Sequence, residues 1–269
     1  DWRALAEVAR AAGGVDAVIV DAPYSERTHK GHDDGTSMAN DAARERPDVN
    51  NNQSRYAMGL PMARRLINYA PWTPGDVAAF VDVWAPLTRG WFATLTDHGL
   101  APAWEAALAA TGRYVFSPIA CVEPGSRFRA VGDGPAQWSC WLVVSRPSSM
   151  AWLTEWRTKR RGLGLSCSLP GAYVVGAGTG DARSGRRDGS RVPGGKPLAL
   201  VVDVLRDYAS PGDLVADPTC GGGTTGEGCI ALGMRALLGD IDAAHVAIAA
   251  ERLRELPEAD KRGTLALKW

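Results

Sequence analysis

The stretch that decides the fold runs from residue 217 to residue 226 and reads Asp217-Pro-Thr-Cys-Gly-Gly-Gly-Thr-Thr-Gly226. An apolar run over residues 213–217 leads into it and predicts a buried strand, while residues 224–232 predict a helix. Glycine lets the backbone pass close to a ligand where a Cβ atom would clash, and a helix N-terminus offers free N–H donors to an anionic group. The stretch therefore predicts a strand–turn–helix loop that binds a nucleotide-type cofactor.

A second acidic residue, Asp240, follows roughly 20 residues later, at the end of an apolar strand over residues 236–241. Dinucleotide-binding folds place at this point the carboxylate that accepts hydrogen bonds from the ribose hydroxyls. Gly221-Gly222-Gly223 does not fit Gly-x-Gly-x-x-Gly, and no lysine follows the glycines, so the loop favours neither NAD nor a phosphate-loop nucleotide. A tight glycine turn with a solvated aspartate is the alternative interpretation.

Strands and helices alternate through the last third of the chain, which ends in a predicted helix over residues 243–256. This alternation is typical of a doubly wound parallel sheet. Further helices are expected over residues 2–12, 55–69, 74–87, 102–111 and 198–208, and further strands over residues 15–20, 90–96, 114–122 and 138–145. Residues 26–55 are polar and predict a mobile loop, while residues 151–195 show no clear periodicity.

The tetrapeptide Asp21-Ala-Pro-Tyr24 follows the apolar run 15–20, at the carboxyl end of a strand, where open α/β sheets bind their ligands. The exocyclic amine of a nucleobase is a poor nucleophile, and an enzyme assists it by accepting hydrogen bonds from both amine hydrogens. The Asp21 carboxylate and the Ala22 carbonyl are candidates for these two acceptors, because Pro23 biases Ala22 toward an extended backbone. Tyr24 is a candidate to stack on a base rotated out of the duplex. The alternative is a plain strand exit with Tyr24 in the core.

The composition fits a single α/β domain over residues 1–269. The 30 lysines and arginines balance the 30 aspartates and glutamates, so DNA binding would need a local basic groove rather than a basic surface overall. The five cysteines form no Cys-x-x-Cys pair and no ligand set with the four histidines, which favours a cytoplasmic protein without disulfides or a structural metal. No apolar run is long enough to span a bilayer, so no membrane partner is expected.

These motifs, in this order, resemble the β-class of S-adenosylmethionine-dependent DNA amino-methyltransferases, which act on adenine N6 or cytosine N4. In that family a catalytic Asp-Pro-Pro-Tyr motif precedes a Lys-Pro element and the cofactor motif Asp-Pro-Phe-x-Gly-Ser-Gly-Thr-Thr. The counterparts here are Asp21-Ala-Pro-Tyr24, Lys196-Pro197 and the stretch 217–226. Two departures are present, because Ala22 replaces the first proline and Gly222 replaces the serine.

The resemblance implies S-adenosylmethionine as the cofactor and a Rossmann-like, doubly wound, mostly parallel seven-stranded sheet with helices on both faces. The cofactor site that it implies comprises Asp217, Pro218, Cys220, Gly221, Gly223, Thr224, Thr225, Asp240, Ile241, Lys196 and Pro197. Aspartate at position 21, where cytosine-N4 enzymes usually carry serine, favours adenine N6 of a flipped base as the methyl acceptor. A cytosine-N4 enzyme, a non-catalytic DNA-binding relative and a nicotinamide oxidoreductase are the alternatives.

Double-stranded DNA is the partner that the resemblance implies, as for restriction–modification enzymes, at the nucleoid of a bacterial or phage-infected cell. The basic side chains assigned to its phosphates are Arg157, Lys159, Arg160, Arg161 and Arg187. The alternative for these residues is a solvated helix face and a solubilising loop. Residues 146–195 would form a small target-recognition insertion, the 26–55 loop would order over the DNA, and a homodimer is left open.

Overall fold

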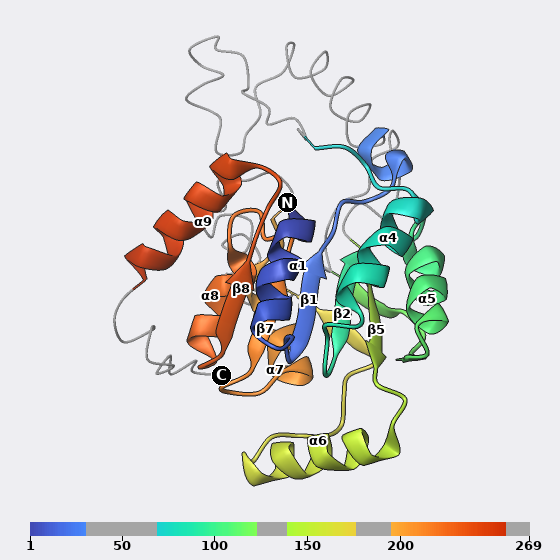
Figure 1. Cartoon of the computed structure of the whole chain (residues 1–269), viewed down its shortest axis with the longest axis vertical. Coiled ribbons are helices and arrows are strands. Elements are labelled where there is room, and N and C mark those ends of the chain that lie inside the picture. The colour runs from blue at the N-terminus through green and yellow to red at the C-terminus, as the bar shows by residue number, and fades with distance from the viewer. Residues whose placement is uncertain (31–68, 123–138, 176–194, 257–269) are drawn as a thin grey trace.

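The computed structural model describes residues 1–30, 69–122, 139–175 and 195–256, whose strands join one sheet (Figure 1). The described strands are β1 (Ala17–Asp21), β2 (Phe92–Thr96), β3 (Tyr114–Val115), β4 (Ile119–Val122), β5 (Ser139–Arg146), β6 (Ala172–Val174), β7 (Leu214–Asp217) and β8 (Arg235–Leu238). The described helices are α1 (Trp2–Ala11), α4 (Pro74–Trp84), α5 (Ala101–Ala110), α6 (Met150–Gly162), α7 (Leu198–Tyr208), α8 (Thr224–Ala231) and α9 (Ala243–Glu255). Within these ranges no helix combines the length and the apolar character needed to cross a bilayer.

The described strands number eight rather than the expected seven, and their order is β6-β4-β5-β2-β1-β7-β8, with β3 also paired to β5. Relative to the six predicted ranges, the structure adds β6 and divides the run 114–122 into β3 and β4 before Pro118, which lacks the N–H that a continuous ladder requires. Strands β2, β1, β7 and β8 are parallel neighbours, while β5 runs antiparallel to both β2 and β4. The α/β class and the predicted parallel arrangement of the last third are confirmed.

Both faces of the central strands are covered by helices, as the continuous apolar run in β1 predicts for a parallel sheet. Side chains of β1 alternate between two hydrophobic clusters, with Ala17 and Ile19 in one and Val18 and Val20 in the other. The first cluster is completed by α7 and the second by α1, α4 and α5. Helix α4 begins at Pro74 as expected, because Thr73 forms a reciprocal capping box with Asp76.

The position of β1 between β2 and β7 determines where the sequence motifs meet. Val18 lies opposite both Phe92 of β2 and Ala216 of β7, so the three strands end at the same edge of the sheet. Strand β8 pairs in parallel with β7 and ends there too. The residues that follow β1, β7 and β8 therefore lie at one carboxyl edge.

Part of the segment that lacks periodicity is in fact regular. The region 151–195 contains α6 and the short strand β6, which pairs in parallel with β4. The expectation of irregular structure is therefore wrong for these elements, which pack against the sheet. Residues 26–30, at the start of the predicted loop, are helical, so the expectation of a loop is wrong there. The rest of that predicted loop and nearly all of the predicted helix over 55–69 lie outside the described residues.

The basic cluster on α6 does not lie near the carboxyl edge. Figure 1 shows α6 at the end of the molecule opposite to the segment that leaves β1, and Lys159 pairs with Asp213, just before β7 begins. Arg160 is 1% exposed, and its guanidinium donates to the carbonyls of Ser166, Arg206 and Ala209. The assignment of Arg160 to DNA is therefore wrong, because its donors already satisfy buried carbonyls.

Helical spacing explains this burial. Leu153, Trp156 and Arg160 lie three and four residues apart on α6, so they share the face that packs on the core, whereas Arg157 and Arg161 are exposed. The side chain of Arg160 therefore extends inward with its apolar neighbours. It links α6 to the end of α7.

Replacing Arg160 with alanine tests this structural role. We expect Arg160→Ala to lower the free energy of unfolding by at least about 3 kcal/mol, because three carbonyls lose a charged donor. The adjacent, exposed Arg161→Ala is the matched control and should change stability by less than about 0.5 kcal/mol. Urea unfolding measures the free energy of unfolding of both variants. Equal losses of stability in the two variants would contradict the proposed anchoring of α6.

Candidate active site

The glycine loop links β7 to α8 in the predicted strand–turn–helix arrangement. Gly221 and Gly223 have φ angles of +46° and +82°, which side chains with a Cβ atom rarely adopt. A Cβ atom on Gly223 would come within 2.8 Å of the Cβ atom of Ala249 on α9, so this glycine also permits close helix packing. The loop is held to the neighbouring strand exit by a hydrogen bond from Cys220 N to Gly239 O of 2.9 Å.

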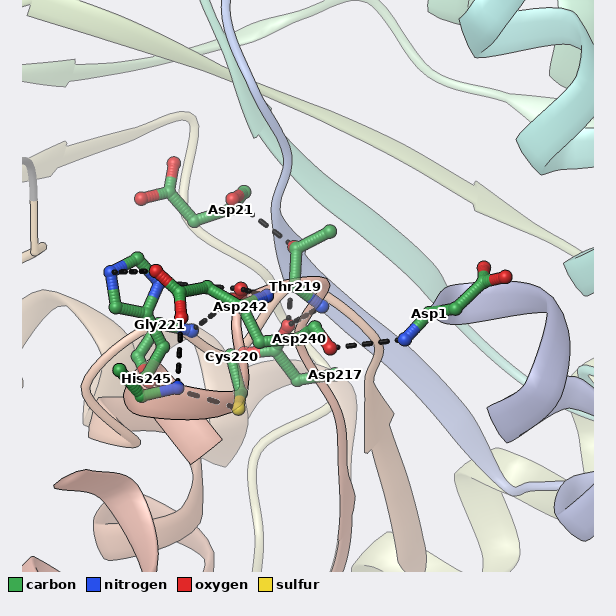
Figure 2. Close-up of polar contacts among 10 residues, drawn as sticks. Asp1, Asp21, Asp217, Thr219, Cys220, Gly221, Asp240, Asp242 and His245 are labelled. Atoms are coloured by element: carbon green, nitrogen blue, oxygen red, sulfur yellow. Dashed lines mark hydrogen bonds and ion pairs between the residues drawn. The ribbon is translucent and has the colours of Figure 1, made fainter. Parts of the chain in front are cut away.

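Asp240 lies at the exit of β8, next to the glycine loop (Figure 2). Its Oδ2 atom accepts a hydrogen bond from Gly221 N at 2.9 Å, and its Oδ1 atom accepts one from Asp242 N at 2.9 Å. The Nδ1 atom of His245 lies 3.2 Å from Oδ1. Asp240 thus holds the glycine loop in place. The next residue, Ile241, is 81% exposed.

Asp21 and Lys196 form an ion pair at the end of β1. The Nζ atom of Lys196 lies 2.7 Å from Asp21 Oδ2, and the side chains of Lys196 and Asp21 are 13% and 28% exposed, respectively. The same Nζ atom lies 4.6 Å from the centroid of the Tyr24 ring, a cation–π distance. Among the described residues, neither Asp21 Oδ1 nor the Tyr24 hydroxyl has a hydrogen-bond partner, although both atoms are buried.

Tyr24 is neither fully buried in the core nor fully exposed. Its hydroxyl is buried and its ring packs against the core cluster that contains Cys140, but the residue as a whole remains partly exposed. Ala22 is buried, and Pro23 is partly exposed. The hydroxyl end of the ring is therefore the enclosed end.

Thr219 connects the two motifs. Its hydroxyl donates to the backbone carbonyl of Asp21 at 3.2 Å, and its backbone N–H donates to Asp217 Oδ1 at 3.1 Å (Figure 2). Sequence reasoning assigned no role to Thr219, although it stands inside the decisive stretch. Its contact with Asp21 spans 198 residues of sequence, so the structure brings the tetrapeptide and the glycine loop together.

Three carboxyl groups, those of Asp21, Asp217 and Asp240, lie at this edge. Burial raises the pKa of Asp217 to about 7, with smaller contributions of the same sign from Asp21 and Asp240. Burial also raises the pKa of Asp21, although Lys196 acts in the opposite direction. For Lys196, burial acts to lower the pKa, but Asp21 and the other neighbouring groups together outweigh it and the pKa is raised. The site therefore favours a protonated Lys196.

The remaining predicted cofactor residues lie around the same loop. Thr224, Thr225 and Pro218 are buried, and Pro197 is the buried residue at the start of α7. Burial raises the pKa of the Cys220 thiol, which keeps this sulfur neutral. In the described part of the chain, no group of His, Cys, Asp and Glu side chains is arranged to hold a metal ion.

The predicted DNA contacts are not brought to this edge. Arg157 and Arg161 are exposed on α6, at the other end of the sheet, together with Lys159. Arg187 lies outside the described residues. A residue that sequence reasoning missed is Asp97, at the exit of β2; an acidic residue directly after a buried strand is the signal that identifies it.

Replacing Asp217 with asparagine tests the buried charge. The folded protein retains the Asp217 proton up to about pH 7, whereas the ordinary value is 3.8, so ionisation makes stability fall as the pH rises through this window. We expect the free energy of unfolding of Asp217→Asn, relative to the native protein, to increase by about 2–3 kcal/mol from pH 5 to pH 8. Urea unfolding at both pH values measures it, and a pH-independent difference would contradict the assignment.

Known proteins resemble this chain in two respects. A family model matches the part of the chain that carries the glycine loop, and solved structures match the fold. The N6/N4 methyltransferase family model, described as a DNA methylase, matches residues 150–251. No curated protein matches the sequence. The matched segment contains Lys196, the glycine loop and Asp240, while the tetrapeptide at residues 21–24 precedes it.

Solved structures resemble the chain over nearly its whole length. The crystal structure of the M1.HpyAVI–SAM complex has a TM-score of 0.54 and 16% identity, with 94% of each chain covered. A second crystal structure of M1.HpyAVI has a TM-score of 0.53 and 16% identity, again with 94% of each chain covered. TTHA0409, a putative DNA modification methylase from Thermus thermophilus, has a TM-score of 0.50 and 16% identity, covering 94% of this chain and 93% of that one.

These likenesses show a shared fold. The family match shows that residues 150–251 are similar to the N6/N4 family of DNA methylases.

Proposed function

We propose that the protein transfers a methyl group from S-adenosylmethionine to adenine N6 of a base extruded from duplex DNA. The observation that carries this proposal is the contact of Thr219 with both Asp21 and Asp217, which joins the tetrapeptide to the glycine loop. A methyl donor on the loop would then face a methyl acceptor held by the tetrapeptide. The order of the motifs along the chain supports the β-class arrangement.

The residues of the site suit the charge and the apolar ring of S-adenosylmethionine. The cofactor supplies a methyl group on a positively charged sulfur, and it also carries an ammonium group. Asp21 and Asp240 provide carboxylates at one edge, with Lys196 as the cation paired to Asp21, and Asp217 adds a negative charge when its proton is lost near pH 7. The exposed side chain of Ile241 offers an apolar surface beside Asp240 for the adenine ring. M1.HpyAVI, which shares the fold, has been solved as a SAM complex.

Asp240 would contact the ribose through its remaining lone pairs. Each carboxylate oxygen already accepts one backbone hydrogen bond, from Gly221 and from Asp242, and an oxygen can accept more than one. The same carboxylate would then shape the loop and bind the sugar, which couples cofactor binding to the position of the glycines.

The tetrapeptide can assist the acceptor amine. Lys196 occupies Asp21 Oδ2, which leaves the buried Oδ1 atom to accept one amine hydrogen, and the Ala22 carbonyl would accept the other. The raised pKa of Asp21 suits this carboxylate to receive the proton that nitrogen releases. Lys196 lies over the Tyr24 ring and would leave the ring's other face to the extruded base.

Adenine N6 is proposed over cytosine N4 on the identity of residue 21, since an aspartate stands where cytosine-N4 enzymes of the resembling family usually carry serine. Cytosine N4 is the second candidate, because the family model covers both. Digestion of methylated DNA to nucleosides separates the two products.

Target recognition is proposed for the segment 146–195, excluding the face of α6 that packs on the core. Phosphate contacts of the exposed Arg157 and Arg161 would require the DNA to reach the far end of the sheet, and Arg187 remains a candidate. The nucleoid is the proposed place of action, since the substrate would be DNA.

Asp21→Asn tests the catalytic assignment. We expect it to reduce kcat for methyl transfer to duplex DNA by at least about 100-fold, because the carboxylate loses its charge where positive charge develops on nitrogen. Binding of S-adenosylmethionine, measured by calorimetry, should persist. Transfer is measured with labelled S-adenosylmethionine and unmodified duplex of mixed sequence.

The matched control is Asp16→Asn. Asp16 precedes the same strand at its opposite end, where it binds Arg89 and Leu214 N. This control should leave kcat unchanged. Native-like kcat in Asp21→Asn would refute the role of Asp21, and a native protein that transfers no methyl group would refute the proposed function.

A further inference from the structure

Asp97 links the exit of β2 to the segment that leaves the tetrapeptide. Its carboxylate accepts four hydrogen bonds, and the residue is only 4% exposed. Oδ2 accepts from Ser25 N at 2.9 Å, from Ser25 Oγ at 2.5 Å and from Thr28 Oγ1 at 2.6 Å. Oδ1 accepts from Leu100 N at 2.9 Å. Three of the four donors therefore belong to the chain directly after Tyr24.

Two backbone contacts hold the peptide group between Tyr24 and Ser25. Its N–H donates to Asp97, and its carbonyl accepts a hydrogen bond from Trp72 N at 3.0 Å. A planar peptide group held at both ends cannot rotate without breaking both bonds. The ring of Pro23 fixes the φ angle of the residue before Tyr24. The backbone of Tyr24 is thus fixed on both sides.

The turn that carries Asp97 fits closely against Ser25. A Cβ atom on Gly99 would lie 2.9 Å from Ser25 Oγ and 3.4 Å from Asp97 Oδ1, so only glycine leaves space for this hydrogen bond. Burial acts to raise the pKa of Asp97, but the hydrogen bonds from Ser25 and Thr28 outweigh it and hold the pKa below its ordinary value. The carboxylate therefore remains an acceptor at neutral pH.

We propose that Asp97 is a positioning residue, which fixes the peptide group after Tyr24 and so keeps the Asp21–Tyr24 tetrapeptide in its reactive geometry. The proposal rests on the proposed methyl transfer. Strand β2 lies beside β1, so Asp97 braces the tetrapeptide from one side while Lys196 holds Asp21 by an ion pair. The brace also offers a structural reason why Ala22 can replace the family's first proline, since the rigidity lost there is supplied after Tyr24.

Two variants perturb this brace independently. Asp97→Asn removes the charge and presents an N–H₂ group to at least one donor, while Gly99→Ala displaces the Ser25 hydroxyl from its partner. We expect each to lower kcat between about 10- and 100-fold, because misplacement of reacting groups is expressed in the rate. The dissociation constant for S-adenosylmethionine should not change. Asp76→Asn is the control, since this carboxylate accepts hydrogen bonds from Thr73 in a helix cap, and kcat should be unaffected.

Hydrogen exchange supplies a readout that does not depend on catalysis. In the ligand-free protein, the Ser25 amide should exchange about tenfold faster or more in Asp97→Asn, as expected if about 1.4 kcal/mol of protection is lost, while the Val18 amide in β1 keeps its native rate. If the Ser25 amide and kcat are both unchanged in the two variants, the proposal is overturned. If the native protein transfers no methyl group but the Ser25 amide responds, the proposed function fails and the brace stands. If Asp97→Asn does not fold, the Ser25 amide exchange rate and kcat of Gly99→Ala decide the test.

Discussion

Parallel pairing of β1 with β7 is the constraint on which the site depends. The two strands are adjacent in the sheet although they lie far apart in the sequence, and they end at the same edge. Thr219 then spans the short gap between their exits with one bond to Asp21 and one to Asp217. Strand β8 adds Asp240 on the other side of β7. Shifting β1 away from β7 would separate the tetrapeptide from the glycine loop.

The carboxyl groups at the same edge are largely shielded from water. Burial disfavours the ionised forms of Asp217 and Asp21, and among the residues that the structure describes Lys196 is the cation paired with Asp21. Such an arrangement costs stability in the absence of a ligand and becomes favourable when a cation binds. The brace at Asp97 differs in this respect, because its carboxylate is fully hydrogen-bonded and stabilises the fold directly. A cationic cofactor and a rigid tetrapeptide are therefore two separate consequences of one sheet edge.

Local sequence signals predicted the elements that surround the site. The capped start of α4 at Thr73, the bounds of α7 at 198–208 and the strand–turn–helix around the glycine loop all follow from short-range chemistry. The burial of Arg160 was missed, although its helical spacing from Leu153 and Trp156 signals an inward face. Its carbonyl partners on the turn after α6 and at the end of α7 arise only when distant segments pack.

The polar contacts of the site, too, could be predicted only in part from the sequence. An aspartate after each buried strand could be identified from the sequence, but the partner of each carboxylate could not. Lys196 reaches Asp21 across 175 residues, and Asp97 reaches Ser25 across 72. Asp240 was expected to bind ribose, and its contacts to Gly221 and Asp242 depend on how the two loops approach each other. Strand order decides these contacts, and strand order is a property of the whole sheet.

A structure of the protein with S-adenosylhomocysteine and an adenine-containing duplex would show whether the tetrapeptide and the glycine loop form one active site. We expect the sulfur atom over the glycine loop, directed toward an extruded adenine whose amino group contacts Asp21 Oδ1 and the Ala22 carbonyl. A sulfur atom directed away from Asp21, or an adenine bound at another edge of the sheet, would contradict this expectation.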